Sequence, residues 1–332
     1  MKPWLWLSPE MAYQLAPHAL RLYTHISKPK QLTWKPLTWR GLTFQNPLGT
    51  SGGVDKNAEH IQDWWRWGVG FQELGTITPQ PQTPNPGKII NRSAAKKLVW
   101  NKMGFPNEGM AQFLKNISQT PRPYLTPLLI NIGKNRWTPN EKAHEDYIFG
   151  LKALYSTADI FVINISSPNT AGLRDLLKPE NLKNFLEPIV STNLELAGAN
   201  KAKPLLLKLS PDQSIEELES TLNTSLQLGI DGWILTNTTN QLGHQYHMPT
   251  EGGISGAPLA DISRNLLQSA VEILGNRKKD HLLISSGGIL TPNDVFERLE
   301  LGADLVQVYA ALIFEGPQFF SSVAKSAIRR YS

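Results

Sequence analysis

The stretch of sequence that decides the fold runs from Asp159 to Arg174 and reads D-I-F-V-I-N-I-S-S-P-N-T-A-G-L-R. Residues 160–165 form an almost unbroken apolar run, which is typical of a strand buried on both faces of a parallel sheet. Small hydrogen-bonding side chains follow at once: Asn164, Ser166, Ser167, Asn169 and Thr170. Ser-Pro-Asn-Thr is also good turn chemistry. Because such groups are costly to bury without partners, their place at the end of a core strand favours a functional site.

The same pattern of an apolar strand followed by a helix recurs along the chain. Strands are expected near residues 47–51, 71–76, 126–132, 159–165, 204–209, 232–236, 282–286 and 305–309. Helices are expected near 57–67, 107–118, 141–155, 179–195, 214–228, 261–275, 292–301 and 316–330. Strand–helix alternation indicates a parallel α/β sheet, and eight units predict a (β/α)₈ barrel. The long Pro-rich loop from Pro79 towards Phe105 exceeds ordinary loop length, which favours a functional role.

The first 38 residues differ from the rest, so we expect a small N-terminal extension over 1–38 and the (β/α)₈ barrel over 39–332. Ser8 and Pro9 are typical of a helix start, and Pro17 divides the apolar pattern, which predicts two short amphipathic helices before residue 27. Leu37–Trp39 and Leu42–Phe44 are predicted to form a hairpin. The helices' apolar face either packs on the barrel or meets a membrane.

Charge and composition limit the classes of function. Residues 1–40 carry the whole formal charge of +5, so the remainder is neutral, which argues against nucleic-acid binding. The basic, Trp-rich beginning favours an anionic surface such as a membrane. The chain has no cysteine, which excludes a catalytic thiol within it. No apolar run is long enough to span a membrane. No metal site is expected, because the strand ends lack histidine and paired carboxylates.

The ends of the expected strands carry an amide-rich set of side chains: Asn101 (which ends the long loop), Asn131, Asn164, Asn169 and Asn237. A carboxamide both donates and accepts hydrogen bonds, so several together suit a ligand that is a cyclic amide. Lys56 and Lys208 add positive charge for a carboxylate or an electron-rich ring. Glycine-rich turns at 252–256 and 287–288 suit a phosphate, whose usual place in this barrel follows strands seven and eight.

These motifs together resemble the class 2, quinone-dependent dihydroorotate dehydrogenases over nearly the whole chain. The matching segments are N-P-L-G-x-x-x-G-x-D-K (46–56), E-L-G-T-I-T-P (73–79), N-K-M-G-F (101–105), N-I-S-S-P-N-T-x-G-L-R (164–174), K-L-S-P-D (208–212), T-N-T-T (236–239) and G-G-I-S-G-x-P-L (252–259). The resemblance implies oxidation of dihydroorotate to orotate in pyrimidine biosynthesis, with FMN as hydride acceptor and a membrane quinone as terminal acceptor.

The resemblance also implies residue roles. Ser167 would be the catalytic base, with Thr170 and Phe105 on the proton exit path. The residues implied for the substrate are Lys56, Asn101, Lys102, Met103, Gly104, Phe105, Asn164, Asn169, Asn237 and Thr238. Those implied for FMN are Gly52, Gly53, Val54, Asp55, Lys56, Thr76, Asn131, Asn164, Lys208, Thr236, Gly256, Gly288, Tyr309 and Ala310. Arg92, Tyr309 and Tyr13 would contact the quinone.

Three places depart from the family pattern. Tyr13 stands where the family commonly has His, the family's P-R-x-F-R stretch survives only as residues 88–92 with Arg92 as its last Arg, and Ala310 stands where Ser or Thr is usual. The expected location is peripheral, on the cytoplasmic face of a bacterial inner membrane, with no nucleic-acid partner. Two alternatives stay open. One is a class 1-type flavin barrel with a soluble acceptor, which the missing cysteine opposes. The other is a phosphate-binding barrel without activity, which would be colourless when purified.

Overall fold

Eight parallel strands close into a barrel in the computed structural model, which describes residues 2–26, 28–30 and 32–331. The strands around the barrel are, in spatial order, β10 (Gly232–Leu235), β12 (Leu282–Ser286), β13 (Leu305–Val308), β3 (Leu48–Asp55), β4 (Phe71–Ile77), β7 (Leu128–Ile132), β8 (Ile160–Asn164) and β9 (Leu205–Leu209). Every neighbouring pair around it is parallel. The predicted (β/α)₈ fold is confirmed, and each of the eight expected strands is present.

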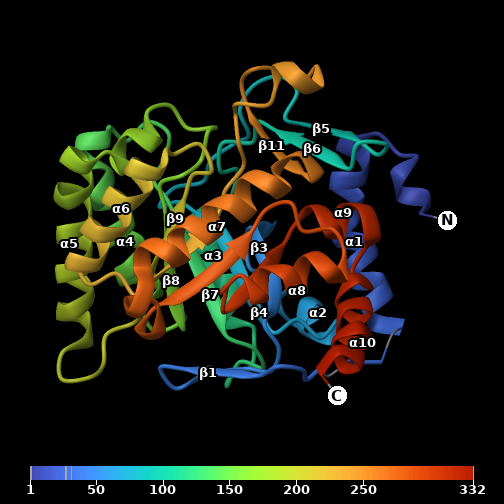
Figure 1. Cartoon of the computed structure of the whole chain (residues 1–332), viewed down its shortest axis with the longest axis horizontal. Helices are drawn as coiled ribbons and strands as arrows, with labels where there is room; N and C mark the ends of the chain where they lie inside the picture. The colour runs from blue at the N-terminus through green and yellow to red at the C-terminus, as the bar shows by residue number, and fades with distance from the viewer. Residues whose placement is uncertain (1, 27, 31, 332) are drawn as a thin grey trace.

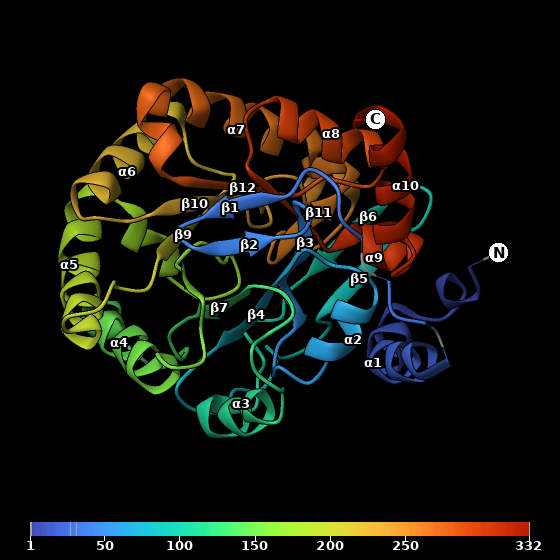
Figure 2. The ribbon, with the colours of Figure 1, turned by 90° about the horizontal axis from the view of Figure 1, so that it is seen from below.

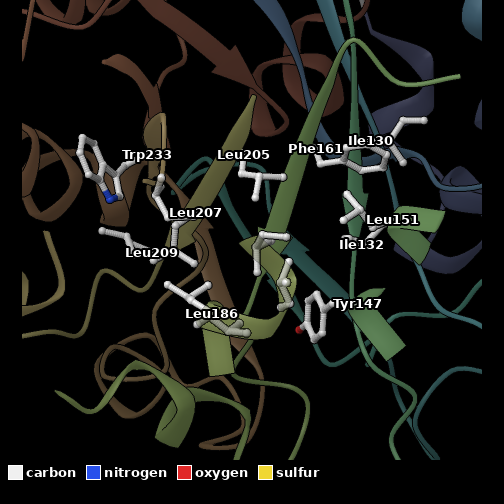
Figure 3. Packing of buried hydrophobic residues seen from close by; sticks show 14 of the residues in the cluster. Ile130, Ile132, Tyr147, Leu151, Phe161, Leu186, Leu205, Leu207, Leu209 and Trp233 are labelled. Atoms are coloured by element: carbon white, nitrogen blue, oxygen red, sulfur yellow. The ribbon is translucent and has the colours of Figure 1, made fainter. Parts of the chain in front are cut away.

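A ring of helices surrounds the barrel (Figure 2). They are α2 (Ile61–Arg66), α3 (Gly109–Ser118), α4 (Ala143–Leu154), α5 (Pro179–Ala197), α6 (Ile215–Gln227), α7 (Ala260–Leu274), α8 (Pro292–Glu300) and α10 (Phe319–Tyr331), each overlapping an expected helix. A short helix α9 (Ala310–Glu315), which the sequence pattern did not predict, follows β13. Between helices and strands lies the larger core, where Tyr147 and Leu151 of α4 face Ile132 and Phe161 (Figure 3).

The inside of the barrel has an apolar layer at one end and a polar layer at the other. The apolar layer contains Phe71, Leu129, Val162, Leu206, Ile234, Ile284 and Leu305. Side chains along a strand point to the same face at every second residue. Two positions further along these strands stand Glu73, Asn131, Asn164, Lys208, Thr236, Ser286 and Gln307, all buried. The chain therefore changes from apolar to polar inside the barrel towards the carboxyl ends of its strands.

The predicted hairpin is confirmed as β1 (Leu37–Trp39) and β2 (Leu42–Phe44), an antiparallel pair. Phe44 is fully buried and meets Phe71 edge to face at 5.9 Å between ring centroids. The hairpin crosses the apolar end of the barrel (Figure 2). That end is therefore covered, and space for a ligand lies at the opposite end.

The long Pro-rich segment and the glycine-rich turn are not simple loops, which corrects the sequence interpretation. β5 (Ile90–Ser93) pairs antiparallel with β6 (Leu98–Asn101), and β6 pairs with β11 (Gly253–Gly256). This three-stranded sheet lies beside the end of the barrel away from β1 (Figure 1). Each strand has four residues, and the β6–β11 pairing joins segments about 150 residues apart. Such short strands have little periodicity, so the sequence pattern could not reveal them.

The beginning of the chain holds one α-helix where two were expected. α1 (Pro9–Ile26) continues through Pro17 and follows a 3-10 helix, Pro3–Leu5. Proline removes one main-chain donor and disfavours a helix interior, yet this helix continues with Pro17 on an exposed stretch. Positions 1, 27 and 31 of the expected 1–38 extension lie outside the described residues.

The extension is held against the rest of the molecule by polar contacts. Arg92 of β5 donates to the main-chain carbonyls of Trp4 at 2.8 Å and Leu7 at 2.7 Å, and Trp4 Nε1 donates to Ile313 O at 2.7 Å. Apolar side chains of the extension nevertheless face solvent: Trp6, Met11, Leu15, Leu22 and Ile26. Among the described residues, no helix is both long and apolar enough to cross a bilayer.

Candidate active site

A cavity of about 1000 Å³, counted to its open mouth, lies at the carboxyl ends of the barrel strands. It brings together most of the residues predicted from sequence: Gly52, Gly53, Lys56, Thr76, Asn101, Met103, Gly104, Phe105, Asn131, Asn164, Ser167, Asn169, Lys208, Thr236, Asn237, Thr238, Gly256, Gly288, Tyr309 and Ala310. They come from the ends of the barrel strands and from the three-stranded sheet.

A buried ion pair forms part of the polar layer under this cavity. Lys208 Nζ lies 2.8 and 3.1 Å from the two carboxylate oxygens of Glu73, and Asn131 Nδ2 also donates to Glu73. The two charged side chains are 5% and 0% exposed. A Cβ atom at Gly52 would overlap a Glu73 oxygen, so the main chain can cross here only as glycine. Buried charges need such partners, because removing them from water is costly.

Carboxamides and hydroxyls form two hydrogen-bonded groups at the cavity. Asn164 Nδ2 donates to Thr76 Oγ1 at 2.9 Å, and Asn237 Nδ2 donates to Ser166 Oγ at 3.0 Å. Asn169 Nδ2 donates to Asn101 Oδ1 at 3.0 Å, which joins the loop after β8 to the end of β6. These bonds hold the amides in defined orientations in the site.

Ser167 lies in this cavity and is 4% exposed. Its Oγ accepts a hydrogen bond of 3.2 Å from the Asn169 main-chain N–H. A hydroxyl that accepts one bond keeps its own proton donor and a second lone pair for a ligand. The geometry therefore presents Ser167 Oγ, with a fixed orientation, to whatever occupies the cavity.

Arg174 joins three loops. It is the last residue of the stretch from Asp159 to Arg174 that includes β8. Its guanidinium donates to Ser166 O at 3.0 Å, to Thr238 O at 2.9 Å and to Asp212 Oδ2 at 2.6 Å. The loops after β8, β9 and β10 thus share one planar donor group, which suits such multiple, directional contacts. Arg174 positions the cavity-lining residues of two of those loops without lining the cavity itself.

The glycine-rich rim of the cavity is closely packed. The Gly287 carbonyl accepts a 2.8 Å hydrogen bond from Ser263 Oγ of α7. Because C=O and N–H of a trans peptide point in opposite directions, the N–H of Gly288 lies on the other side of that peptide. A Cβ at Gly288 would approach the Ala260 main-chain nitrogen to 2.5 Å, and Gly288 has φ +74°. Only glycine fits there, and an exposed peptide N–H is suited to an anion.

Lys56 is the second lysine of the cavity. Its Nζ donates to Gly53 O at 2.9 Å and to the Tyr13 hydroxyl of α1 at 3.0 Å. Burial lowers the pKa of the Lys56 ammonium, but Tyr13, Tyr309 and Asp55 outweigh burial and hold the pKa above its ordinary value. Tyr309 lies in the cavity wall, and burial raises the pKa of its phenol. Lys56 therefore remains a cation at neutral pH.

Some predicted residues do not line the cavity: Thr170, Lys102, Val54, Asp55, Arg92 and Tyr13. The Asp55 carboxylate accepts the main-chain N–H groups of Glu59 and His60, at 3.0 and 2.8 Å, which shapes the turn before α2. The Val54 side chain packs against a core cluster, and Lys102 pairs with Glu251 at the surface. Arg92 holds the extension.

Thr170 is buried behind the cavity. Its Oγ1 has no hydrogen-bond partner among the described residues, and neither do Asn131 Oδ1, Asn169 Oδ1 and both polar atoms of Gln307. Buried polar atoms are nearly always satisfied in a folded protein, so these atoms indicate a place for bound polar groups or water.

Sequence reasoning missed several residues of the site. These are Glu73 below the cavity and, in its lining, Ser51, Pro106, Leu259, Ser286, Ile289, Gln307 and Val308. Ser255 and Gly287 also line the cavity, and they lie in the glycine-rich turns that were expected to hold a phosphate. Some of them appeared only as parts of motifs or turns and received no role. A signal for Glu73 and Gln307 did exist, because each stands two positions after an inward-facing apolar residue of a barrel strand.

Comparison with known proteins agrees with this geometry. A protein-family model described as dihydroorotate dehydrogenase matches residues 37–330. A protein of Dichelobacter nodosus named dihydroorotate dehydrogenase (quinone) is 39% identical over 317 residues, which cover 94% of this chain and 92% of that protein. A protein of Sulfurimonas denitrificans with the same name is 38% identical, over 97% of this chain and 91% of its own.

A solved structure gives the same result for the fold. The crystal structure of DHODH from Eimeria tenella in complex with ferulenol superposes with a TM-score of 0.86 and 31% sequence identity, covering 97% of this chain and 91% of that one. The similarity thus includes the N-terminal region as well as the barrel. The chain belongs to the dihydroorotate dehydrogenase family, in the class whose members are named quinone-dependent.

Proposed function

We propose that this protein oxidises dihydroorotate to orotate in pyrimidine biosynthesis, with FMN as the resident cofactor and a membrane quinone as the final electron acceptor. The observation that carries the proposal is a cavity lined by Ser167, amide side chains and two lysines, in a chain of the dihydroorotate dehydrogenase family. That family depends on flavin. The names of the relatives support the choice of a quinone over a soluble acceptor.

The residues of the cavity fit a flavin mononucleotide. Asn131 Oδ1 and both polar atoms of the Gln307 side chain are buried without a partner among the described residues, and a flavin ring edge alternates donors and acceptors. Lys208 supplies positive charge under the cavity. The closely packed rim at Gly256 and Gly288 suits the phosphate. FMN bound there would supply the acceptor for the hydride of dihydroorotate and the donor of electrons to the quinone.

The chain's own residues supply orientation and proton transfer. The oriented amides of Asn101, Asn164, Asn169 and Asn237 hold the pyrimidine ring by its amide groups, and orientation of this kind lowers the barrier to reaction. Lys56 binds the substrate carboxylate. Ser167 Oγ removes the proton from C5 of dihydroorotate while the C6 hydride leaves. Because a serine hydroxyl is a weak base, Ser167 must pass a proton onward while it takes up the proton from C5.

Thr170 and Phe105 form the exit for that proton. Thr170 Oγ1 is buried with no partner among the described residues, so a water molecule there would be well bound and would carry the proton from Ser167. Phe105 lines the cavity beside Gly133 and excludes bulk solvent from the pyrimidine ring of the substrate. Met103, Gly104 and Thr238 complete the wall around the substrate.

Residues 1–38 serve as the quinone-access segment, distinct from the barrel over 39–332. Trp6 and Ile26 are 76% and 75% exposed, and residues 1–38 hold five Lys or Arg against one Glu, a formal charge of +4 out of the chain's +5. Apolar residues of such a helix enter the lipid boundary, while Lys and Arg meet anionic headgroups. The protein is then peripheral on the cytoplasmic face of a bacterial inner membrane, and the quinone reaches the flavin past Tyr13, Arg92 and Tyr309.

One experiment tests the activity directly. The purified protein is examined by visible spectroscopy before and after anaerobic addition of dihydroorotate, and then after addition of a quinone. We expect a yellow protein with about one FMN per chain, bleached by dihydroorotate and restored by the quinone. A folded protein that lacks flavin, or whose flavin is not reduced by dihydroorotate, would contradict the proposal. Restoration by fumarate or NAD and not by quinone would favour the class 1-type alternative.

A further inference from the structure

A side chain outside the cavity holds one of the cavity's two lysines. Tyr13 belongs to α1 and does not line the cavity, whereas Lys56 does. The Tyr13 hydroxyl accepts a 3.0 Å hydrogen bond from Lys56 Nζ, and its ring centroid lies 4.9 Å from the same atom. Both contacts act on the ammonium group, so α1 is joined to the site through the part of Lys56 that would meet a ligand.

The ammonium of Lys56 has three N–H donors. Two of them are taken, one by Tyr13 and one by the Gly53 carbonyl. The third has no protein acceptor among the described residues. A lysine with a single free donor, held from two other sides, has lost most of its rotamer freedom before a ligand arrives. Binding of an anion then costs less conformational entropy than binding to an unrestrained lysine.

We propose that Tyr13 is a positioning residue for the substrate: its hydroxyl orients the Lys56 ammonium towards the carboxylate of the ligand in the cavity. The seating of α1 therefore helps to set the affinity for dihydroorotate and orotate, in addition to any part that α1 plays in quinone access. This inference rests on the proposed function, because it takes the carboxylate of that substrate as the partner of Lys56.

The titratable groups around Lys56 make the inference testable by pH. Tyr13 contacts the ammonium from α1, and Tyr309 in the segment after β13 and Asp55 at the end of β3 also raise the pKa of Lys56. The Tyr13 hydroxyl contributes to raising the pKa of Lys56, so its removal lowers that pKa. A lysine is charged below its pKa. Loss of the hydroxyl therefore shifts the alkaline loss of orotate binding to lower pH.

The test compares Tyr13→Phe with Tyr23→Phe in the full-length, flavin-loaded protein. Tyr13→Phe removes the hydroxyl but keeps the ring over Lys56. Tyr23 is on the same helix, is 53% exposed and stacks on Trp67 at 5.1 Å, so it controls for disturbance of α1. Orotate affinity is measured by calorimetry and by the flavin spectral shift, from pH 7 to the alkaline limit.

We expect Tyr13→Phe to weaken orotate binding by about 10-fold at neutral pH, as for a lost hydrogen bond to a charged group. In Tyr13→Phe the alkaline loss of orotate binding should occur at lower pH than in the wild type. Tyr23→Phe should match the wild type in both affinity and pH dependence. Unchanged affinity and pH profile in Tyr13→Phe would overturn the inference, as would equal losses in both variants. A flavin-loaded wild type that does not bind orotate would overturn the proposed function, and this inference with it.

Discussion

The cavity wall and helix α1 differ in which side chains they bury and which they expose. The cavity buries polar groups, such as the Lys208–Glu73 pair and the amides around Ser167, and gives most of them partners. Helix α1 exposes apolar groups, with Leu22 69% and Ile26 75% accessible. Burial of partnered polar groups specifies a small polar ligand, whereas exposed apolar groups suit an apolar surface. The cavity should therefore govern the half-reaction with dihydroorotate, and the exposed apolar side chains of α1 should govern the half-reaction with the quinone.

The sharpest separation comes from Ser167→Ala. Loss of the proposed base should slow reduction of the flavin by dihydroorotate by roughly 10²–10⁴-fold, since that is the usual contribution of a general base. Re-oxidation of the chemically reduced protein by quinone should stay near the wild-type rate. Anaerobic stopped-flow measurements of both half-reactions would check this. If dihydroorotate reduces the flavin of the Ser167→Ala protein at the wild-type rate, the base is another residue.

A second change tests the buried charge under the cavity. Glu73→Gln leaves the Lys208 ammonium buried without its counter-charge. We expect the free energy of unfolding to fall by about 3 kcal/mol, as for a broken buried ion pair. Denaturant titration of the flavin-loaded protein would measure it. Glu219→Gln on α6 removes an exposed carboxylate and serves as the control, and equal stabilities of the two variants would contradict the expectation.

Substitution of the amides should act on affinity. Asn169→Asp or Asn237→Asp removes an amide donor that holds Asn101 or Ser166, and it adds negative charge where the substrate carboxylate is expected. We expect orotate binding to weaken by about 10-fold or more in each variant. Titration of the flavin spectrum with orotate would measure the loss. Wild-type affinity in both variants would remove these two residues from the substrate site.

Substitutions in α1 and at its neighbour Trp6 should affect the half-reaction with the quinone and leave reduction by dihydroorotate nearly unchanged. Replacing Trp6, Leu22 and Ile26 together by Ser should abolish binding to anionic liposomes at low salt and raise the apparent KM for a long-chain quinone. Reduction by dihydroorotate should change little. Leu125 and Leu194, 59% and 61% exposed elsewhere on the molecule, provide a matched control pair. If the triple variant still binds liposomes, these three residues do not mediate membrane binding.

The same contrast explains why sequence reasoning succeeded in one region and failed in another. Most of the barrel strands were predictable because they are buried apolar runs followed by polar residues at the strand end. α1 was divided wrongly at Pro17, because the exposed helix tolerates one missing donor. The strands β5, β6 and β11 were missed because they have four residues each and pair across long separations.

By itself, the sequence determined the order of strands and helices, the (β/α)₈ barrel, and the residues that gather at its open end. These follow from local periodicity and from the rule that parallel strands end at the same edge. Only the tertiary structure decided which polar groups became partners: Lys208 with Glu73, Asn169 with Asn101, and Lys56 with Tyr13. Each pair joins residues between 43 and 135 positions apart. Contacts of that range depend on barrel closure and on the seating of α1, which local sequence patterns do not encode.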